Sequence, residues 1–243
     1  MYEEENEMKI LKNNDEERRK KKDGKLKVEV APQLTARDLT AIAWLVEQRA
    51  ATLPQLTTLL GYLGAGEITL RRGAQLVSRW EQLGLVERSF VWHREPAVLW
   101  PTTAGAKLVG LPRWRRPAVG TLRHTIATSA VRLRSCRPWN DRTWLTEQQL
   151  RELLPKGVRI PDGAIVEPDG VSITACEVEL TSHGRRRVRE AMTSLLAARS
   201  GDNDWFHYVL YLCSEETIHQ CKAVRAELPE HLRARVVVLA CPT

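Results

Sequence analysis

Apolar residues recur every three or four positions in the first part of the chain, which is the spacing of amphipathic helices. Three such segments cover about residues 35–50, 53–63 and 68–84. Thr35, with Asp38 three positions later, predicts an N-terminal cap for the first helix. The spacing then changes to every second residue on both sides of the turn at 93–96, which predicts two strands joined as a hairpin.

Three helices followed by a hairpin is the order of a winged helix-turn-helix, and we assign residues 33–112 to such a domain. Its third helix presents a polar face that suits the major groove of DNA. The hairpin adds basic side chains for the DNA backbone or the minor groove. The alternative is a module for protein contacts with a merely solvated basic face. The predicted DNA-binding residues here are Arg71, Arg72, Gln75, Arg79, Arg88, His93 and Arg94.

Two charged segments flank this domain. Residues 1–32 contain EEENE and DEERRKKK with few apolar positions, which predicts a disordered tail. Residues 113–120 are basic and bracketed by prolines, which is typical of a linker. Its Arg113, Arg115 and Arg116 suit phosphate contacts, although a linker that only stays solvated has the same composition.

The second half, residues 121–243, alternates helical and strand patterns. Helices are predicted at 122–136, after Thr146, at about 179–200 and at 215–228. Three strands are predicted within 158–179, and two buried strands at about 205–213 and 234–241. This order predicts an α/β sandwich around a mixed sheet. The chain as a whole is then of the α+β class.

Three carboxylates occur close together in the predicted sheet. Glu177 and Glu179 stand two positions apart on one strand, so their side chains point to the same side. Asp162 stands at the head of a neighbouring strand. Grouped carboxylates repel one another and usually bind a divalent cation or a basic partner. A solvated sheet edge is the alternative.

Composition narrows the class of partner. The formal net charge is +7 and the pI is about 9.3, which favours an anionic partner such as nucleic acid. No apolar run is long enough for a bilayer, so we expect a cytoplasmic protein without a membrane partner. The five cysteines form no CxxC pair, which indicates reduced thiols and neither a zinc site nor a disulfide framework.

The PDG at 161–163 followed by E-V-E at 177–179 resembles the PD-(D/E)xK nuclease-like fold. In that family a helical glutamate, the aspartate of PD and an acidic residue on the next strand hold Mg²⁺ or Mn²⁺ and activate water. Glu147, Asp162 and Glu177 stand at the matching positions. Glu179 replaces the family's lysine, which removes a fixed cation near the attacking water. The resemblance therefore implies a degenerate nuclease-like domain.

The combination of both halves, with W-L-T-E-x-x-L before PDG and E-V-E-L-T, resembles the replication-relaxation family of bacterial plasmids and integrative elements. It implies a double-stranded DNA-binding protein of mobile-element replication, maintenance or transfer. The missing lysine argues against nuclease activity and leaves open whether the protein is an enzyme. One alternative is a metal-dependent endonuclease or nickase, with catalytic Glu147, Asp162, Glu177 and Glu179 and metal ligands Asp162, Glu177 and Glu179. Another is an adaptor for a plasmid replication or transfer protein. Winged-helix proteins also often form homodimers.

Overall fold

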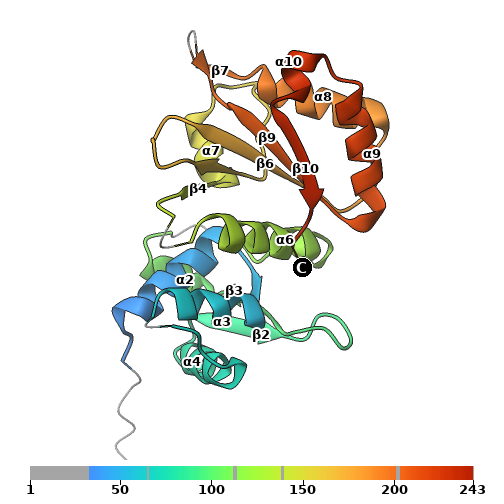
Figure 1. The fold of residues 1–243 in the computed structure, drawn as a ribbon. Coiled ribbons are helices and arrows are strands. Elements are labelled where there is room, and N and C mark those ends of the chain that lie inside the picture. Colours follow the sequence, from blue (N-terminus) through green and yellow to red (C-terminus); the bar gives the residue numbers. More distant parts are fainter. Residues whose placement is uncertain (1–32, 65, 112–113, 138–139, 201–202, 243) are drawn as a thin grey trace, which may run out of the picture. The chain divides into compact units, whose positions relative to one another are not determined.

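The front part of the chain combines helices with a small antiparallel sheet. In the computed structural model the helices are α2 (Ala36–Gln48), α3 (Leu53–Tyr62), α4 (Leu70–Gln82) and α5 (Thr103–Leu108). The strands are β1 (Ala51–Thr52), β2 (Val86–Ser89) and β3 (Val98–Pro101), in the sheet order β1-β3-β2 (Figure 1). We call residues 34–111 the front module.

The structure describes residues 33–64, 66–111, 114–137, 140–200 and 203–242. The tail predicted at residues 1–32 and Arg113 of the predicted linker lie outside these ranges.

The helix boundaries of the front module follow from local chemistry. Thr35 and Asp38 form the predicted capping box at the start of α2. A second capping box, Thr52 with Gln55, starts α3, and a proline lies in its first turn. Gly84 follows α4 at φ 68°, a backbone conformation that glycine adopts without strain. Strand β1 was not predicted, because two residues are too few to show an alternating pattern.

The second part of the chain contains a five-stranded mixed sheet in the order β10-β9-β6-β5-β4. Strands β4 (Thr143–Thr146), β5 (Gly163–Val166) and β6 (Ile173–Glu179) are antiparallel neighbours, whereas β9 (Tyr208–Cys213) and β10 (Val236–Ala240) run parallel to β6. The helices are α7 (Glu147–Leu153), α8 (Arg185–Leu196), α9 (Glu215–Ala226) and α10 (Glu230–Arg233). Short strands β7 (Arg199–Ser200) and β8 (Asn203–Asp204) pair separately. We call residues 140–242 the sheet module.

The prediction of three strands within 158–179 was wrong, since the structure has two there. Residues 158–162 form no strand, because Pro155 and Gly157 make a turn and Pro161 has no backbone N–H for a ladder. The additional strand of the sheet is β4, which comes earlier in the chain, directly before α7, and was not predicted. The α+β class and the mixed sheet are as predicted.

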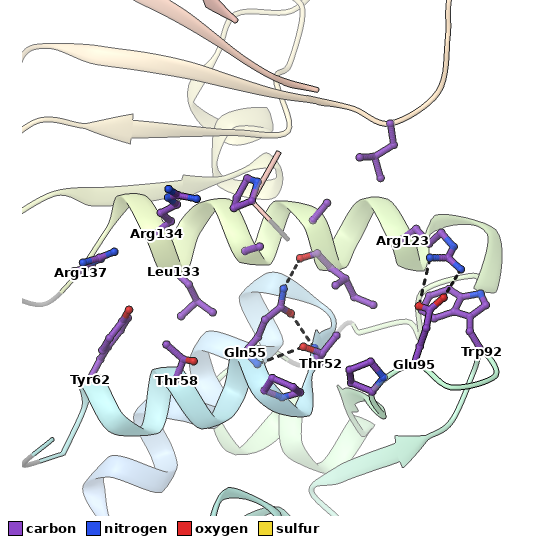
Figure 2. Close-up of a pocket in the computed structure, with 17 residues that line it drawn as sticks. Thr52, Gln55, Thr58, Tyr62, Trp92, Glu95, Arg123, Leu133, Arg134 and Arg137 are labelled. Carbon is purple, nitrogen blue, oxygen red and sulfur yellow. Dashed lines mark hydrogen bonds and ion pairs between the residues drawn. The ribbon is translucent and has the colours of Figure 1, made fainter. Parts of the chain in front are cut away.

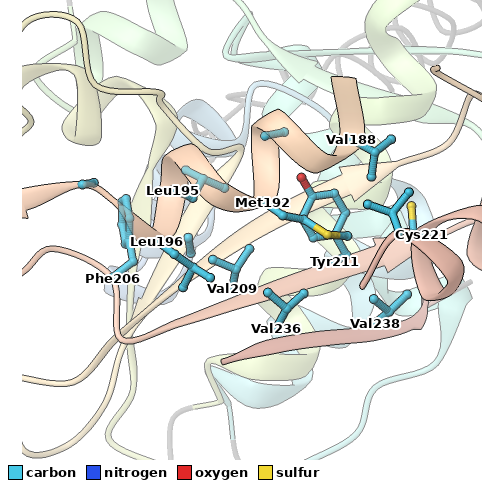
Figure 3. Packing of buried hydrophobic residues seen from close by; sticks show 14 of the residues in the cluster. Val188, Met192, Leu195, Leu196, Phe206, Val209, Tyr211, Cys221, Val236 and Val238 are labelled. Atoms are coloured by element: carbon cyan, nitrogen blue, oxygen red, sulfur yellow. The ribbon is translucent and has the colours of Figure 1, made fainter. Parts of the chain in front are cut away.

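The two faces of the sheet pack against different helices. Ala175 of β6 and Tyr211 of β9 belong to the core formed with α8 and α9, which Figure 3 shows around Met192 and Leu195. Cys176 and Val178, the intervening residues of β6, pack on the other face with Val131 of α6 (Val119–Ser135). The alternation of β6 therefore separates two cores.

Helix α6 lies between the two modules in the sequence and packs against both. Towards the front module, Gln55 Nε2 donates a hydrogen bond of 2.9 Å to the carbonyl of Ile126 (Figure 2), and Ser129 Oγ donates one of 2.7 Å to the carbonyl of Ala50. Leu133 joins the front core, whereas Val131 joins the core of the sheet. Residues 34–243 accordingly form one compact unit.

Two further features concern the described residues. None of their helices is both long enough and apolar enough to cross a membrane. All five cysteines are free thiols, and three of them are buried.

Candidate functional site

Asp162 lies at the start of β5 and joins two elements through one oxygen. Its Oδ2 accepts a hydrogen bond of 2.7 Å from the backbone N–H of Val178 on β6. The same oxygen lies 3.1 Å from Nε2 of His124 on α6, so the imidazole N–H donates to the carboxylate. Asp162 therefore fixes the position of the imidazole relative to the sheet.

Glu177 and Glu179 lie on the same side of β6, at the end of the strand that leads to α8. Residues two apart on a strand share a face, so both follow Ala175 on the side of the α8 core. Only 8% of Glu177 is exposed, and its Oε1 accepts a hydrogen bond of 3.0 Å from Nε of Arg159. Glu179 lies 3.5 Å from Nε2 of His183. Each glutamate thus has its own basic neighbour.

Burial and mutual repulsion change the protonation of these groups. Burial raises the pKa of Glu177 to about 7, and the Asp162 carboxylate adds to the rise while Arg159 opposes it. Burial likewise raises the pKa of Glu179. The hydrogen bond to Asp162 raises the pKa of His124 above its ordinary value, although burial acts in the opposite direction. The site can therefore hold and exchange protons near neutral pH.

These side chains line one pocket of about 400 Å³, which we call the acid pocket. Three carboxylates and five basic groups line it, namely Asp162, Glu177, Glu179, Arg123, His124, Arg159, His183 and Arg187. Glu147, the first residue of α7, lines a different hollow of about 690 Å³ and forms an ion pair with Arg151. His124 and Asp162 line both spaces. The structure therefore separates Glu147 from the two glutamates of β6.

The predicted metal ligands do not fit a divalent cation as they are arranged here. His124 and a backbone N–H both donate to Oδ2 of Asp162, and Arg159 donates to Oε1 of Glu177, so donors already engage one oxygen of each carboxylate. Within the part of the chain that the structure describes, no group of three or more His, Cys, Asp or Glu side chains could hold a metal ion. No chemical step is therefore assigned to a metal.

The polar face of α4 is the second candidate site. Arg71, Arg72 and Gln75 are exposed, and Arg72 Nη1 donates a hydrogen bond of 3.2 Å to Oε1 of Gln75. Arg79, predicted for the same face, forms an ion pair with the fully buried Asp38 of α2. We therefore assign Arg79 to the packing of α2 against α4 and leave it out of the DNA-binding set.

The basic residues of the hairpin and linker fall into two groups. His93 and Arg94 are exposed in the loop between β2 and β3, where Arg94 has a φ of 58°. Arg88 is paired with Glu81 at 2.7 Å. In the linker, Arg115 is exposed, and Arg116 stacks 4.0 Å from the centre of the Trp100 ring. Arg88 and Arg116 thus also stabilise the hairpin.

The basic residues of the acid pocket are not among the residues predicted from the sequence. Two of them form hydrogen bonds with its carboxylates, since His124 contacts Asp162 and Arg159 supplies a cation beside Glu177. Both contacts join residues that are 18 or more positions apart, so no local spacing shows them. The only signal was the presence of these residue types next to the predicted site.

Comparison of the chain with known proteins finds no matching family model, no similar curated protein and no similar solved structure.

Proposed function

We propose that the protein binds double-stranded DNA through the front module, as a winged helix-turn-helix, and that the acid pocket belongs to a degenerate nuclease-like domain. The order α2-β1-α3-α4-β2-β3 with the sheet order β1-β3-β2 supports the first assignment. In such a module the helix at the position of α4 enters the major groove, and the hairpin lies against the backbone.

The observation that carries the proposal is the exposed face of α4. Gly73 packs α4 closely against α3, since a Cβ on this glycine would lie 2.1 Å from Oγ1 of Thr57. Arg71, Arg72 and Gln75 remain exposed on the outside. Arginine and glutamine are the side chains that pair with guanine and adenine edges, and arginine also binds phosphates. The net charge of +7 favours the same partner.

A DNA titration tests this function. The double variant Arg71→Ala, Arg72→Ala should weaken duplex binding by at least about tenfold, and the slope of log K against log salt should fall by roughly two if both arginines contact phosphates. Arg186→Ala is the matched control, because Arg186 is a 91% exposed arginine on α8. Equal affinities for the double variant and the control would remove α4 as the DNA-binding helix.

The role in mobile-element replication, maintenance or transfer rests on the family resemblance alone. It predicts preferred binding to a duplex from a plasmid origin or transfer region over random DNA at the same salt concentration. A bacterial cytoplasmic location, a homodimer and an adaptor role belong to the same set of proposals.

A metal-dependent endonuclease or nickase is the second candidate, favoured by the three carboxylates that share the acid pocket. The donors that hold Asp162 and Glu177 count against it. Supercoiled plasmid with Mg²⁺ or Mn²⁺ is the test, and nicking that disappears in Asp162→Ala and Glu177→Ala would raise this candidate above the first. Nicking that persists in the combined variant would indicate a contaminating nuclease.

A further inference from the structure

A groove of about 810 Å³ runs along α6, between this helix and α3 (Figure 2). It contains neither the polar face of α4 nor any carboxylate of the acid pocket, although Arg123 and Leu180 line both the groove and that pocket. We call it the helix groove. Its remaining walls come from the hairpin loop, with Trp92 and Glu95, and from Leu180 beyond β6.

One face of α6 forms the floor of the groove over about three turns. The lining residues recur at three- and four-residue spacing, which defines a single stripe on a helix. The middle of the stripe is apolar and includes two small residues, and both ends carry arginine. In order, the stripe consists of Arg123, Ile126, Ala127, Ala130, Leu133 and Arg134. From Arg123 to Arg134 it is about 16 Å long at 1.5 Å per residue. Arg137, just beyond the end of α6, also lines the groove.

The opposite wall is a stripe of α3. Gln55, Thr58 and Tyr62 follow one another at three- and four-residue spacing and face the groove. Figure 2 shows Tyr62 and Arg134 near one end of the groove, and Trp92 and Arg123 near the other. The helix groove thus lies between two packed helices, which is the position where a third helix packs in helical bundles.

The charges and the apolar side chains of the helix groove define which ligand fits. Three arginines and one glutamate line it. Glu95 is paired with Arg123 at 2.8 Å, so the surplus of positive charge lies at the other end, where Arg134 is exposed. The apolar middle around Ile126 and Ala130 offers no partner for phosphates and suits leucine-like side chains.

We propose that the helix groove binds an amphipathic helix of a partner protein that carries leucine-like side chains in its middle and a carboxylate at the end beside Arg134. The apolar side chains pack on Ile126, Ala130 and Leu133, and the small Ala127 and Ala130 let the two helices approach closely. A carboxylate at the end of the bound helix pairs with Arg134. This surface would operate while α4 is on DNA, because α3 lies between α4 and α6.

The probe is a fluorescein-labelled synthetic peptide of about 16 residues, or four to five turns. It carries leucine at every third or fourth position and glutamate at both ends. Two control peptides replace the leucines by serine or the glutamates by lysine. We expect anisotropy titrations with the full chain to give binding of the acidic peptide at least about tenfold tighter than of either control.

Substitutions in α6 test whether the peptide binds in the helix groove. Arg134→Glu and Ala130→Glu should each weaken binding of the acidic peptide by about tenfold or more, while Arg186→Glu on α8 should leave it within about twofold. Arg134 is exposed, so its variant should fold normally, and circular dichroism checks this. Duplex DNA affinity, measured on the same variants, reports on α4 and not on the helix groove.

Three results would overturn the proposal. The first is an acidic peptide that binds no better than its serine or lysine control. The second is a single-stranded oligonucleotide that displaces the peptide and loses affinity in Ala130→Glu, which would make the groove a nucleic-acid site. The third is a homodimer in sedimentation that Ala130→Glu dissociates, which would make a second copy of the chain the occupant.

Discussion

Nε2 of His124 lies 3.1 Å from Oδ2 of Asp162, and the same carboxylate oxygen accepts the backbone N–H of Val178 at 2.7 Å. One oxygen atom therefore connects α6, the residue before β5 and the C-terminal end of β6. A proton on the imidazole strengthens its contact with this carboxylate, because the hydrogen bond then joins opposite charges.

The first prediction concerns the titration of His124. Because the hydrogen bond to Asp162 raises the pKa of His124, the folded protein should hold this proton above the ordinary value of 6.5. The stabilisation from the charged imidazole is then complete below pH 6.5 and is lost as pH rises through the folded pKa. Nuclear magnetic resonance of the imidazole nitrogens should show a lower pKa for His124 in Asp162→Asn, and no change in Glu190→Gln. Identical titration in all three proteins would contradict the assigned contact.

The second prediction concerns Glu177. Its folded pKa of about 7 lies above the unfolded value of 4.5, so the folded state binds more protons between these pH values. Stability should therefore decrease as pH rises from about 4.5 to about 7. Glu177→Gln removes this titration. The unfolding free energy of the variant minus that of the wild type should therefore increase by about 3 kcal/mol as pH rises across this range. Urea unfolding at several pH values measures the difference, and Glu190→Gln, on an exposed side chain, serves as control. A difference that is independent of pH would show that folding does not raise the pKa of Glu177.

The third prediction concerns Asp38, which is fully buried in the front module. Its carboxylate accepts hydrogen bonds from Thr35 and from Nε1 of Trp80 at 3.1 Å, and it pairs with Arg79. Asp38→Ala leaves the Trp80 N–H buried without a partner and should cost about 2–4 kcal/mol of unfolding free energy. Glu190→Ala should change it by less than about 0.5 kcal/mol. Equal unfolding midpoints for the two variants would contradict this role.

The pH dependence of Asp38 has the opposite sign to that of Glu177. Burial raises the pKa of Asp38, but the hydrogen bonds from Thr35 and the charge of Arg79 outweigh this and lower it overall. The stabilisation is present above the unfolded pKa of 3.8 and is lost as pH falls through the folded value. Asp38→Asn should therefore reduce the acid-induced loss of stability.

The fourth prediction tests the contact between α3 and α4. Gly73→Ala would place its Cβ 2.1 Å from Oγ1 of Thr57, so the Thr57 side chain or one of the two helices must shift. We expect a loss of about 1–3 kcal/mol in unfolding free energy and weaker duplex DNA binding, because α4 changes its position. Gly120→Ala is the matched control, since nothing lies within 4 Å of a Cβ there and alanine favours the helix. Thermal unfolding of both variants measures the change. Equal unfolding midpoints for Gly73→Ala and Gly120→Ala would show that α3 and α4 have room for a methyl group at Gly73.

Much of the fold is predictable because its signals are local. The cap formed by Thr35 and Asp38, the apolar stripes of α2 and α4, and the apolar runs of β9 and β10 each lie within a few residues. The wrong count of strands at 158–179 has a local cause too, since Val158 and Ile160 read as a strand until the effect of Pro161 on the ladder is considered.

The site was less predictable because its contacts are not local. The grouping of Glu177 and Glu179 follows from the alternation of a strand, but their basic neighbours do not. His124 reaches Asp162 across 38 positions, and Arg159 reaches Glu177 across 18. For Arg79 the local pattern was misleading. Its spacing on α4 groups it with the predicted DNA-binding residues, but its side chain contacts Asp38, which lies 41 positions earlier in the chain. Such pairings depend on how helices pack, which periodicity does not specify.

Helix α6 has a consequence for how this protein can be taken apart. Leu133 completes the core beside α2, and Val131 completes the core beneath the sheet, although the two residues are only one turn apart or less. Cleavage near residue 120 would leave α6 with the sheet module, and the core of the front module would then lose its contact with Leu133. Because neither core is complete without α6, we expect gene recombination to exchange the two modules together.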